Sequence, residues 1–164
     1  MTDDNLLETY LNDHLTGATG GGELFRRVAK NQAGTDRGQE LARLAEEVNE
    51  DRETLRGLMG TLGVRENKAM LAIGWLGEKA ARLKPNGYVV RRSPLSEVVE
   101  IEALRVAVAG KTAGWQVLRL GAEQDPRIPG PQLDTLIARA EDQSDRLRQL
   151  HLRAAETSLT TPDR

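Results

Sequence analysis

Two charged residues interrupt the apolar pattern in the middle of residues 38–63. Apolar side chains recur there at steps of three and four residues: Leu41, Leu44, Val48, Leu55, Leu58 and Leu62. Such steps place side chains on one face of an α-helix. Asp51 and Arg52 occupy the position where the next apolar residue is due. A carboxylate and a guanidinium in the middle of a core-facing stripe have two explanations. They fill the core as an ion pair, or they remain from a ligand site, because carboxylates bind hard metal ions.

Several other kinds of chemistry are excluded or lack support. The chain has no cysteine, which excludes disulfides, zinc–thiolate sites, iron–sulfur clusters and cysteine nucleophiles. No serine has a recognisable setting of histidine and aspartate, so nucleophilic catalysis has no support. Residues 20–22 are all glycine, but they fall inside a helical pattern and lack the Lys-Ser/Thr ending of a phosphate-binding loop.

The composition favours a single helical domain. The chain has 164 residues, which is enough for one core, and 3% of them are aromatic. The core must therefore be built from Leu, Val, Ile and Ala, which favours helices over a β-sandwich. The formal net charge of −2 argues against a general nucleic-acid binder. The acidic N-terminus does not resemble a signal peptide and no apolar run approaches the length of a membrane span, so we expect a cytoplasmic protein.

The periodicity predicts four long helices, at about residues 4–31, 38–63, 93–122 and 132–158. We expect the first helix to continue through its glycines, because its apolar spacing keeps one phase on both sides of them. The core-facing seam expected for the third helix is Leu95, Val99, Glu102, Val106, Ala109, Ala113 and Leu120. Three further residues widen that face: Ile101, Val108 and Trp115.

The connection formed by residues 64–93 is long and has content of its own. Apolar residues between Met70 and Leu83 predict a short helix that lies on the bundle. The same stretch is locally basic, and five residues could form an anion patch: Lys79, Arg82, Lys84, Arg91 and Arg92. Such charges are more often a solvated face whose Lys and Arg stems cover apolar surface.

Four long helices with short, long and short connections describe a four-helix bundle with one crossover. This arrangement resembles the ferritin-like fold, and more closely the small stress-associated ferritin-like bundles of bacteria. The run from Glu46-Glu47 to Leu62-Gly63 is similar to the leucine-rich end of their second helix. The resemblance covers about residues 5–158. It implies an all-α, ferritin-like four-helix bundle with a long crossover. We expect this crossover to carry the extra short helix, residues 1–159 to form a single domain, and the tail at 160–164 to be disordered.

The ferritin-like pattern also implies where metal ligands would stand. A di-metal centre of this kind uses a Glu from each of two helices and a Glu-x-x-His motif from each of the other two. Asp51 stands at that level on the second helix, and counting from the turns gives the matching positions Gly17, Gly110 and Ser144. Glu141 keeps a ligand type in its place, but the chain contains no Glu-x-x-His. We therefore expect no working di-metal centre and no cofactor.

The residues at this level leave two interpretations open. In the first, Arg52 folds inward and pairs with Asp51 or Glu141, so that an ion pair fills the vacated site. In the second, a small polar cavity binds a ligand or a single ion.

The histidines are candidates for polar pairs. His14 lies about one turn from the level of Asp51, which would allow a hydrogen bond between them. Glu102 and His151 fall at similar heights on the third and fourth helices. A lone histidine on a helical seam is more often a satisfied core or interface residue than a metal ligand.

We therefore predict a bundle that has lost its di-metal centre and acts as a non-enzymatic binding or structural protein, and we expect a homo-oligomer, a dimer. One alternative is a metal-binding bundle with weak oxidase or storage activity that uses Glu141, Asp51, Glu47 and His14. The other is a protein that binds anions, nucleic acid or a membrane surface through the basic crossover. The sequence names no substrate and no reaction.

Overall fold

The computed structural model describes residues 4–68 and 95–160 of the chain. The described residues form four helices: α1 (Asp4–Asn31), α2 (Asp36–Thr61), α4 (Ser96–Gly121) and α5 (Gly130–Thr160). These bounds lie within about three residues of the predicted ones, and α1 continues through its glycines, as the phase of its apolar residues predicts. The predicted short helix and the end of the tail lie outside the described residues.

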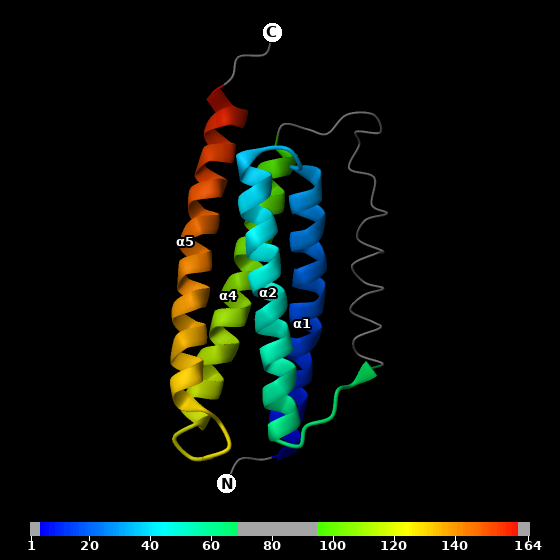
Figure 1. The fold of residues 1–164 in the computed structure, drawn as a ribbon, viewed down its shortest axis with the longest axis vertical. Coiled ribbons are helices and arrows are strands. Elements are labelled where there is room, and N and C mark those ends of the chain that lie inside the picture. The colour runs from blue at the N-terminus through cyan, green and yellow to red at the C-terminus, as the bar shows by residue number, and fades with distance from the viewer. Residues whose placement is uncertain (1–3, 69–94, 161–164) are drawn as a thin grey trace.

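The helices form a bundle in which each one is antiparallel to its neighbours (Figure 1). α1 packs closely against α2, and α4 packs closely against α5, while α1 also contacts α4 and α2 contacts α5 more sparsely. The order around the bundle is therefore α2, α1, α4, α5. The end of α2 and the start of α4 lie at opposite ends of the bundle (Figure 1). This topology is compatible with a ferritin-like bundle.

The ends of α1 and α2 are set by local residues. Gly34 and Gly63 have φ angles of +85° and +74°, a left-handed conformation that glycine adopts without strain. Thr35 caps the start of α2, where its side-chain oxygen accepts a hydrogen bond from the backbone N–H of Gly38 at 3.0 Å. The short turn between the two helices holds them as antiparallel neighbours.

A polar layer divides the core into two apolar clusters. One cluster gathers around Leu11, Leu55 and Trp115, and the other around Phe25, Leu41 and Leu104. Between them lie Asp51 of α2, which is 1% exposed, and Gln143 of α5, which is 0% exposed. The charged interruption of the apolar pattern at Asp51 is therefore at the centre of the bundle.

The predicted seam of α4 lies mostly on the exposed face of this helix, whereas the three residues expected to widen it, Ile101, Val108 and Trp115, are buried. The side chains that enter the core are Ile101, Leu104, Val108, Trp115 and Leu118. Much of the predicted seam is exposed: Leu95 47%, Val99 59%, Val106 72% and Leu120 64%. α4 carries apolar residues at helical spacing on two faces, and the face with the larger side chains, including Trp115, packs inward.

Candidate functional site

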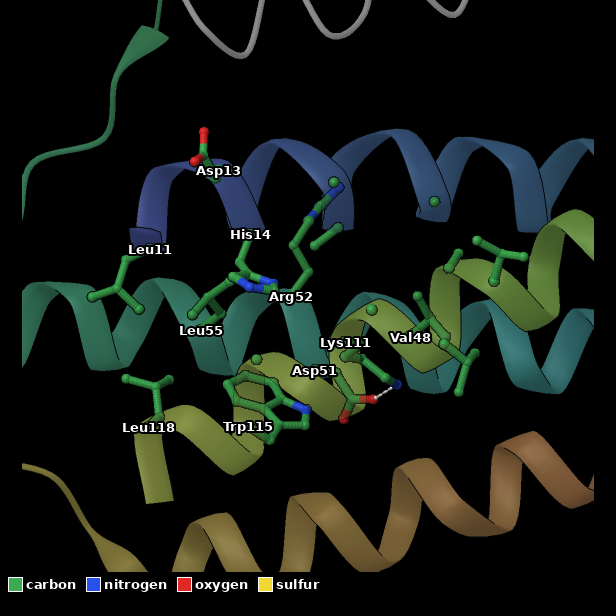
Figure 2. A pocket seen from close by; sticks show the side chains of 18 of the residues that line it. Leu11, Asp13, His14, Val48, Asp51, Arg52, Leu55, Lys111, Trp115 and Leu118 are labelled. Atoms are coloured by element: carbon green, nitrogen blue, oxygen red, sulfur yellow. Dashed lines mark hydrogen bonds and ion pairs between the residues drawn. The ribbon is translucent and has the colours of Figure 1, made fainter. Parts of the chain in front are cut away.

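A cavity of about 330 Å³ lies between α1 and α4, with residues of α2 in its wall (Figure 2). Small residues of the two facing helices line this space: Gly17, Ala18 and Gly21 on α1, and Ala107, Gly110 and Gly114 on α4. A Cβ atom added at Gly17 or Gly110 would have no neighbour within 4 Å. Apolar side chains such as Leu55 and Val108 form much of the remaining wall.

Trp115, a residue of the cavity wall, carries a buried polar atom. The residue is 3% exposed, and its indole Nε1 has no hydrogen-bond partner within the described part of the chain. The indole lies on the side of the cavity away from α1, with Asp51 and Lys111 (Figure 2). The indole N–H is a donor and cannot accept a hydrogen bond. Leaving it unpaired costs about 1–3 kcal/mol. An acceptor on a ligand would remove this cost once a small shift of the cavity wall brings the ligand next to Nε1.

Lys111 joins three helices at the edge of the cavity. Its ammonium group donates hydrogen bonds to the Asp51 carboxylate on α2 and to the Gln143 side-chain oxygen on α5. The Gln143 amide nitrogen in turn donates to Glu47 at 3.0 Å. Burial lowers the pKa of Lys111, and the charge of Asp51 opposes this effect. The polar layer is thus a connected network.

The cation that pairs with Asp51 is Lys111, which corrects the expectation that Arg52 folds inward. Arg52 lines the cavity and donates to Glu53 at 2.8 Å. One residue along a helix turns the side-chain direction by about 100°. Asp51 therefore points toward α4 and α5, while Arg52 lies on the α1 side of α2 (Figure 2).

His14 reaches into the cavity but is not a partner of Asp51. Its ring lies 4.5 Å from that of Tyr10 between centroids, and it packs on the backbone of α4 at Gly114. A Cβ at Gly114 would lie 2.8 Å from His14 Nδ1, so the ring fits here because that residue has no side chain. Burial lowers the pKa of His14, and the nearby charge of Asp13 opposes this effect. The expected His14–Asp51 hydrogen bond is replaced by contacts of Asp51 with α4 and α5.

The α5 residues expected at the same level face elsewhere. Glu141 is exposed, Ser144 is half-buried, and neither lines the cavity. The α5 side chain that reaches the centre is Gln143, and Arg139 lies 3.5 Å from the second oxygen of Asp51. Counting from the turns gave the height of the site correctly on α5, but it could not give the direction of each side chain.

The expected polar pair of Glu102 and His151 forms on the outside of the α4–α5 pair. His151 Nε2 lies 3.1 Å from a Glu102 carboxylate oxygen, and His151 Nδ1 lies 3.0 Å from Arg105. This pair is not part of the cavity wall. The candidate anion patch lies outside the described residues: Lys79, Arg82, Lys84, Arg91 and Arg92.

The structure therefore brings Gly17, Asp51, Arg52 and Gly110 together around one cavity. Lys111 and Trp115 are the two residues whose roles the sequence did not reveal. The predicted phase of α4 placed the opposite face in the core, and this phase left Lys111 outside the expected site. Lys111 follows Gly110 directly and so stands at the level of Asp51, and this position could have indicated its role.

The residues around Asp51 also bear on metal binding. Within residues 4–68 and 95–160, no three His, Asp or Glu side chains are placed to hold a metal ion together. Asp51 is instead surrounded by Lys111, Gln143 and Arg139.

Comparison of the chain with family models, with curated proteins and with solved structures finds no match. Among the described helices, none combines the length and the apolar character needed to cross a membrane.

Proposed function

We propose that this chain is a non-enzymatic binding protein, a ferritin-like bundle without a di-metal centre, and that its α1–α4 cavity takes a small apolar molecule with one hydrogen-bond acceptor. The observation that carries the proposal is the unpaired Nε1–H of Trp115, buried in the wall of an otherwise largely apolar cavity.

The size and lining of the cavity support this class of ligand. Its volume of about 330 Å³ lies at the lower end of the range of small-molecule sites, about 300–1,000 Å³. Such sites combine apolar walls with a few polar groups that fix the orientation of the ligand. The polar groups here include the donors Trp115, Lys111 and Arg52. A carbonyl or carboxylate oxygen on an apolar body complements them.

The charges around Asp51 support a bundle that has lost the metal chemistry of the ferritin-like fold. Lys111 and Arg139 stand beside the carboxylate that would be a metal ligand. Their positive charges would oppose the binding of a divalent cation at this position. The helix order and the connection between opposite ends of the bundle support the ferritin-like part of the proposal.

The metal-binding alternative requires residues that the bundle holds apart. Glu47 and Asp51 both contact Gln143, but Glu141 is exposed and His14 approaches from α1 on the other side of the cavity. Metal analysis of protein purified without chelator would contradict the proposal if it found about two irons per chain. Binding through the basic crossover stays a prediction, and it requires salt-sensitive binding to DNA or anionic vesicles.

A titration with the neutral naphthyl ketone dye prodan tests the proposed ligand class. The dye has an apolar body and one carbonyl acceptor, and its emission shifts to the blue in apolar surroundings. We expect saturable binding that weakens at least tenfold in Gly17→Leu, since this substitution places a side chain at the cavity wall. Gly20→Leu is the matched control, because Gly20 is on the same helix with equally open space and does not line the cavity.

Trp115→Phe tests the hydrogen bond separately. This variant keeps an aromatic ring and removes the donor, so we expect the dye to bind about tenfold more weakly, as the loss of one hydrogen bond implies. Equal affinity for all of these variants would mean that the dye binds elsewhere, and the proposal would be wrong.

A further inference from the structure

The outward face of α4 carries a continuous apolar stripe. Seven residues follow one another at alternating steps of four and three: Val99, Ala103, Val106, Gly110, Ala113, Val117 and Leu120. All seven are exposed. Alternating steps of this kind are the spacing at which one helix packs along another. We call these residues the α4 stripe.

The α4 stripe is unusual in a chain with so many charged residues. Charged residues make up 29% of the sequence, yet none falls on the stripe between Val99 and Leu120. Glu102 borders it, and its carboxylate is paired with His151. A helix that is apolar on both its inner and its outer face is usually buried on both, and a contiguous exposed apolar patch commonly marks an interaction site.

We propose that the α4 stripe is a twofold interface at which α4 packs antiparallel against α4 of a second copy of this chain. In a twofold interface one patch faces itself, so it must be complementary to its own copy. The stripe meets this condition, because an uncharged apolar surface has no like charges to bring together. Antiparallel packing also places the opposite ends of the two helix dipoles beside each other.

The order of residue sizes supports the same arrangement. Gly110 and Ala113 lie at the middle of the α4 stripe, with Val106 and Val117 on either side of them. Val99 and Leu120 lie at its ends. A twofold axis near Gly110 therefore places small residues at the crossing point, where the two backbones come closest, and larger side chains where the helices diverge.

The length of the stripe favours a second copy over a segment of the same chain. The stripe extends over 22 residues of α4, roughly 33 Å at 1.5 Å per residue. The apolar run in the crossover, Met70–Leu83, would cover roughly 21 Å even if all of it were helical. Another α4 covers the whole stripe. Val106 and Gly110 belong to the α4 stripe and also line the α1–α4 cavity, so the two surfaces adjoin. Val117 does not line the cavity and Gly17 is not on the stripe, so substitutions at these two residues test the two proposals separately.

Sedimentation equilibrium of the full-length protein tests the interface. We expect twice the chain mass of 18.0 kDa for the unmodified protein. Val117→Glu should give the mass of one chain at the same concentration, with an unchanged helical circular dichroism spectrum, because it buries a charge in the interface. Leu152→Glu on α5 is the matched control, since Leu152 is 51% exposed and Val117 is 50% exposed. It should remain dimeric.

Cysteine cross-linking gives a second readout that does not depend on a disruptive substitution. The chain has no cysteine, so a single introduced thiol reports on its own position. Gly110→Cys should form a disulfide-linked dimer on oxidation, because the twofold axis brings the two copies of residue 110 together. Leu152→Cys should not.

Two results would overturn the proposal. The first is a monomer at all concentrations. If the thiol of Gly110→Cys were protected from alkylation in that monomer, the chain would cover its own stripe. The second is a dimer that Val117→Glu leaves intact and that Gly110→Cys does not cross-link, which would place the interface on another surface.

Discussion

Lys111 on α4 donates hydrogen bonds both to Asp51 on α2 and to Gln143 on α5, and this contact joins three helices between the two apolar clusters. The side chain of Asp51 is 1% exposed and that of Lys111 is 13% exposed. Removing two charges from water largely offsets their attraction, so such a pair contributes little net stability. Breaking it from one side is costly, so we expect the pair to disfavour other registers of the helices.

Lys111→Met should lower the free energy of unfolding by roughly 3 kcal/mol, since it leaves Asp51 buried beside the more distant Arg139. Adding Asp51→Leu should restore most of this loss, because an apolar pair needs no compensating charge. Urea unfolding measures both changes. Arg148→Met is the control, since Arg148 forms an ion pair with Asp145 on the surface and should change stability little. An unchanged free energy of unfolding in Lys111→Met would contradict the importance of the network.

Gly114→Ala and Gly20→Ala should change stability in opposite directions. The new Cβ at residue 114 would lie 2.8 Å from His14 Nδ1, and overpacking of this kind costs about 1–3 kcal/mol. At Gly20 the Cβ meets nothing within 4 Å, so the better helix propensity of alanine should add about 0.5–1 kcal/mol. In a His14→Ala background, Gly114→Ala should no longer be destabilising. Thermal unfolding of Gly114→Ala, Gly20→Ala, His14→Ala and the His14→Ala/Gly114→Ala double variant compares these effects. Equal shifts for Gly114→Ala and Gly20→Ala would disprove the close packing of His14.

His14 should make the protein less stable as the pH falls. Its pKa in the folded protein is lowered from 6.5 by burial, although Asp13 opposes this effect. Below about pH 6.5 the unfolded chain therefore binds more protons than the folded one, so the free energy of unfolding decreases as the pH falls through the folded pKa. Asp51, Arg52 and Lys111 also line the cavity that His14 enters.

His14→Gln should remove this part of the pH dependence. Urea unfolding between about pH 7.5 and about pH 5 should show a shallower loss of stability in the variant than in the unmodified protein. The chain has two histidines, so an NMR titration of the Cε1 protons can follow His14 directly once the variant assigns its signal. A folded-state pKa at or above 6.5 for His14 would be the contrary result.

The architecture was accessible from the sequence because it depends on signals that are local in the chain. The apolar spacing gives the four helices, and Gly34 and Gly63 end two of them through their left-handed backbone. Asp51 was recognised because it interrupts an apolar stripe, and it lies in the core near the middle of α2, as expected.

The side-chain arrangement of the site was less accessible because it depends on how each helix is rotated. α4 has apolar residues on opposite faces, and periodicity alone does not decide which face packs inward. The wrong choice placed Val106 in the core and Lys111 outside it. Similarly, Gln143 rather than Glu141 faces the centre, since two residues along α5 change the side-chain direction by about 200°.

The indole N–H signal of Trp115 in a ¹H–¹⁵N NMR spectrum tests the proposed binding function most directly. The chain has two tryptophans, so Trp75→Phe leaves one such signal. On addition of prodan, we predict that this signal moves downfield with saturation as Nε1–H donates to the carbonyl, and that the shift is absent in Gly17→Leu and retained in Gly20→Leu. A signal that stays in place while the dye is bound would contradict the proposed cavity ligand.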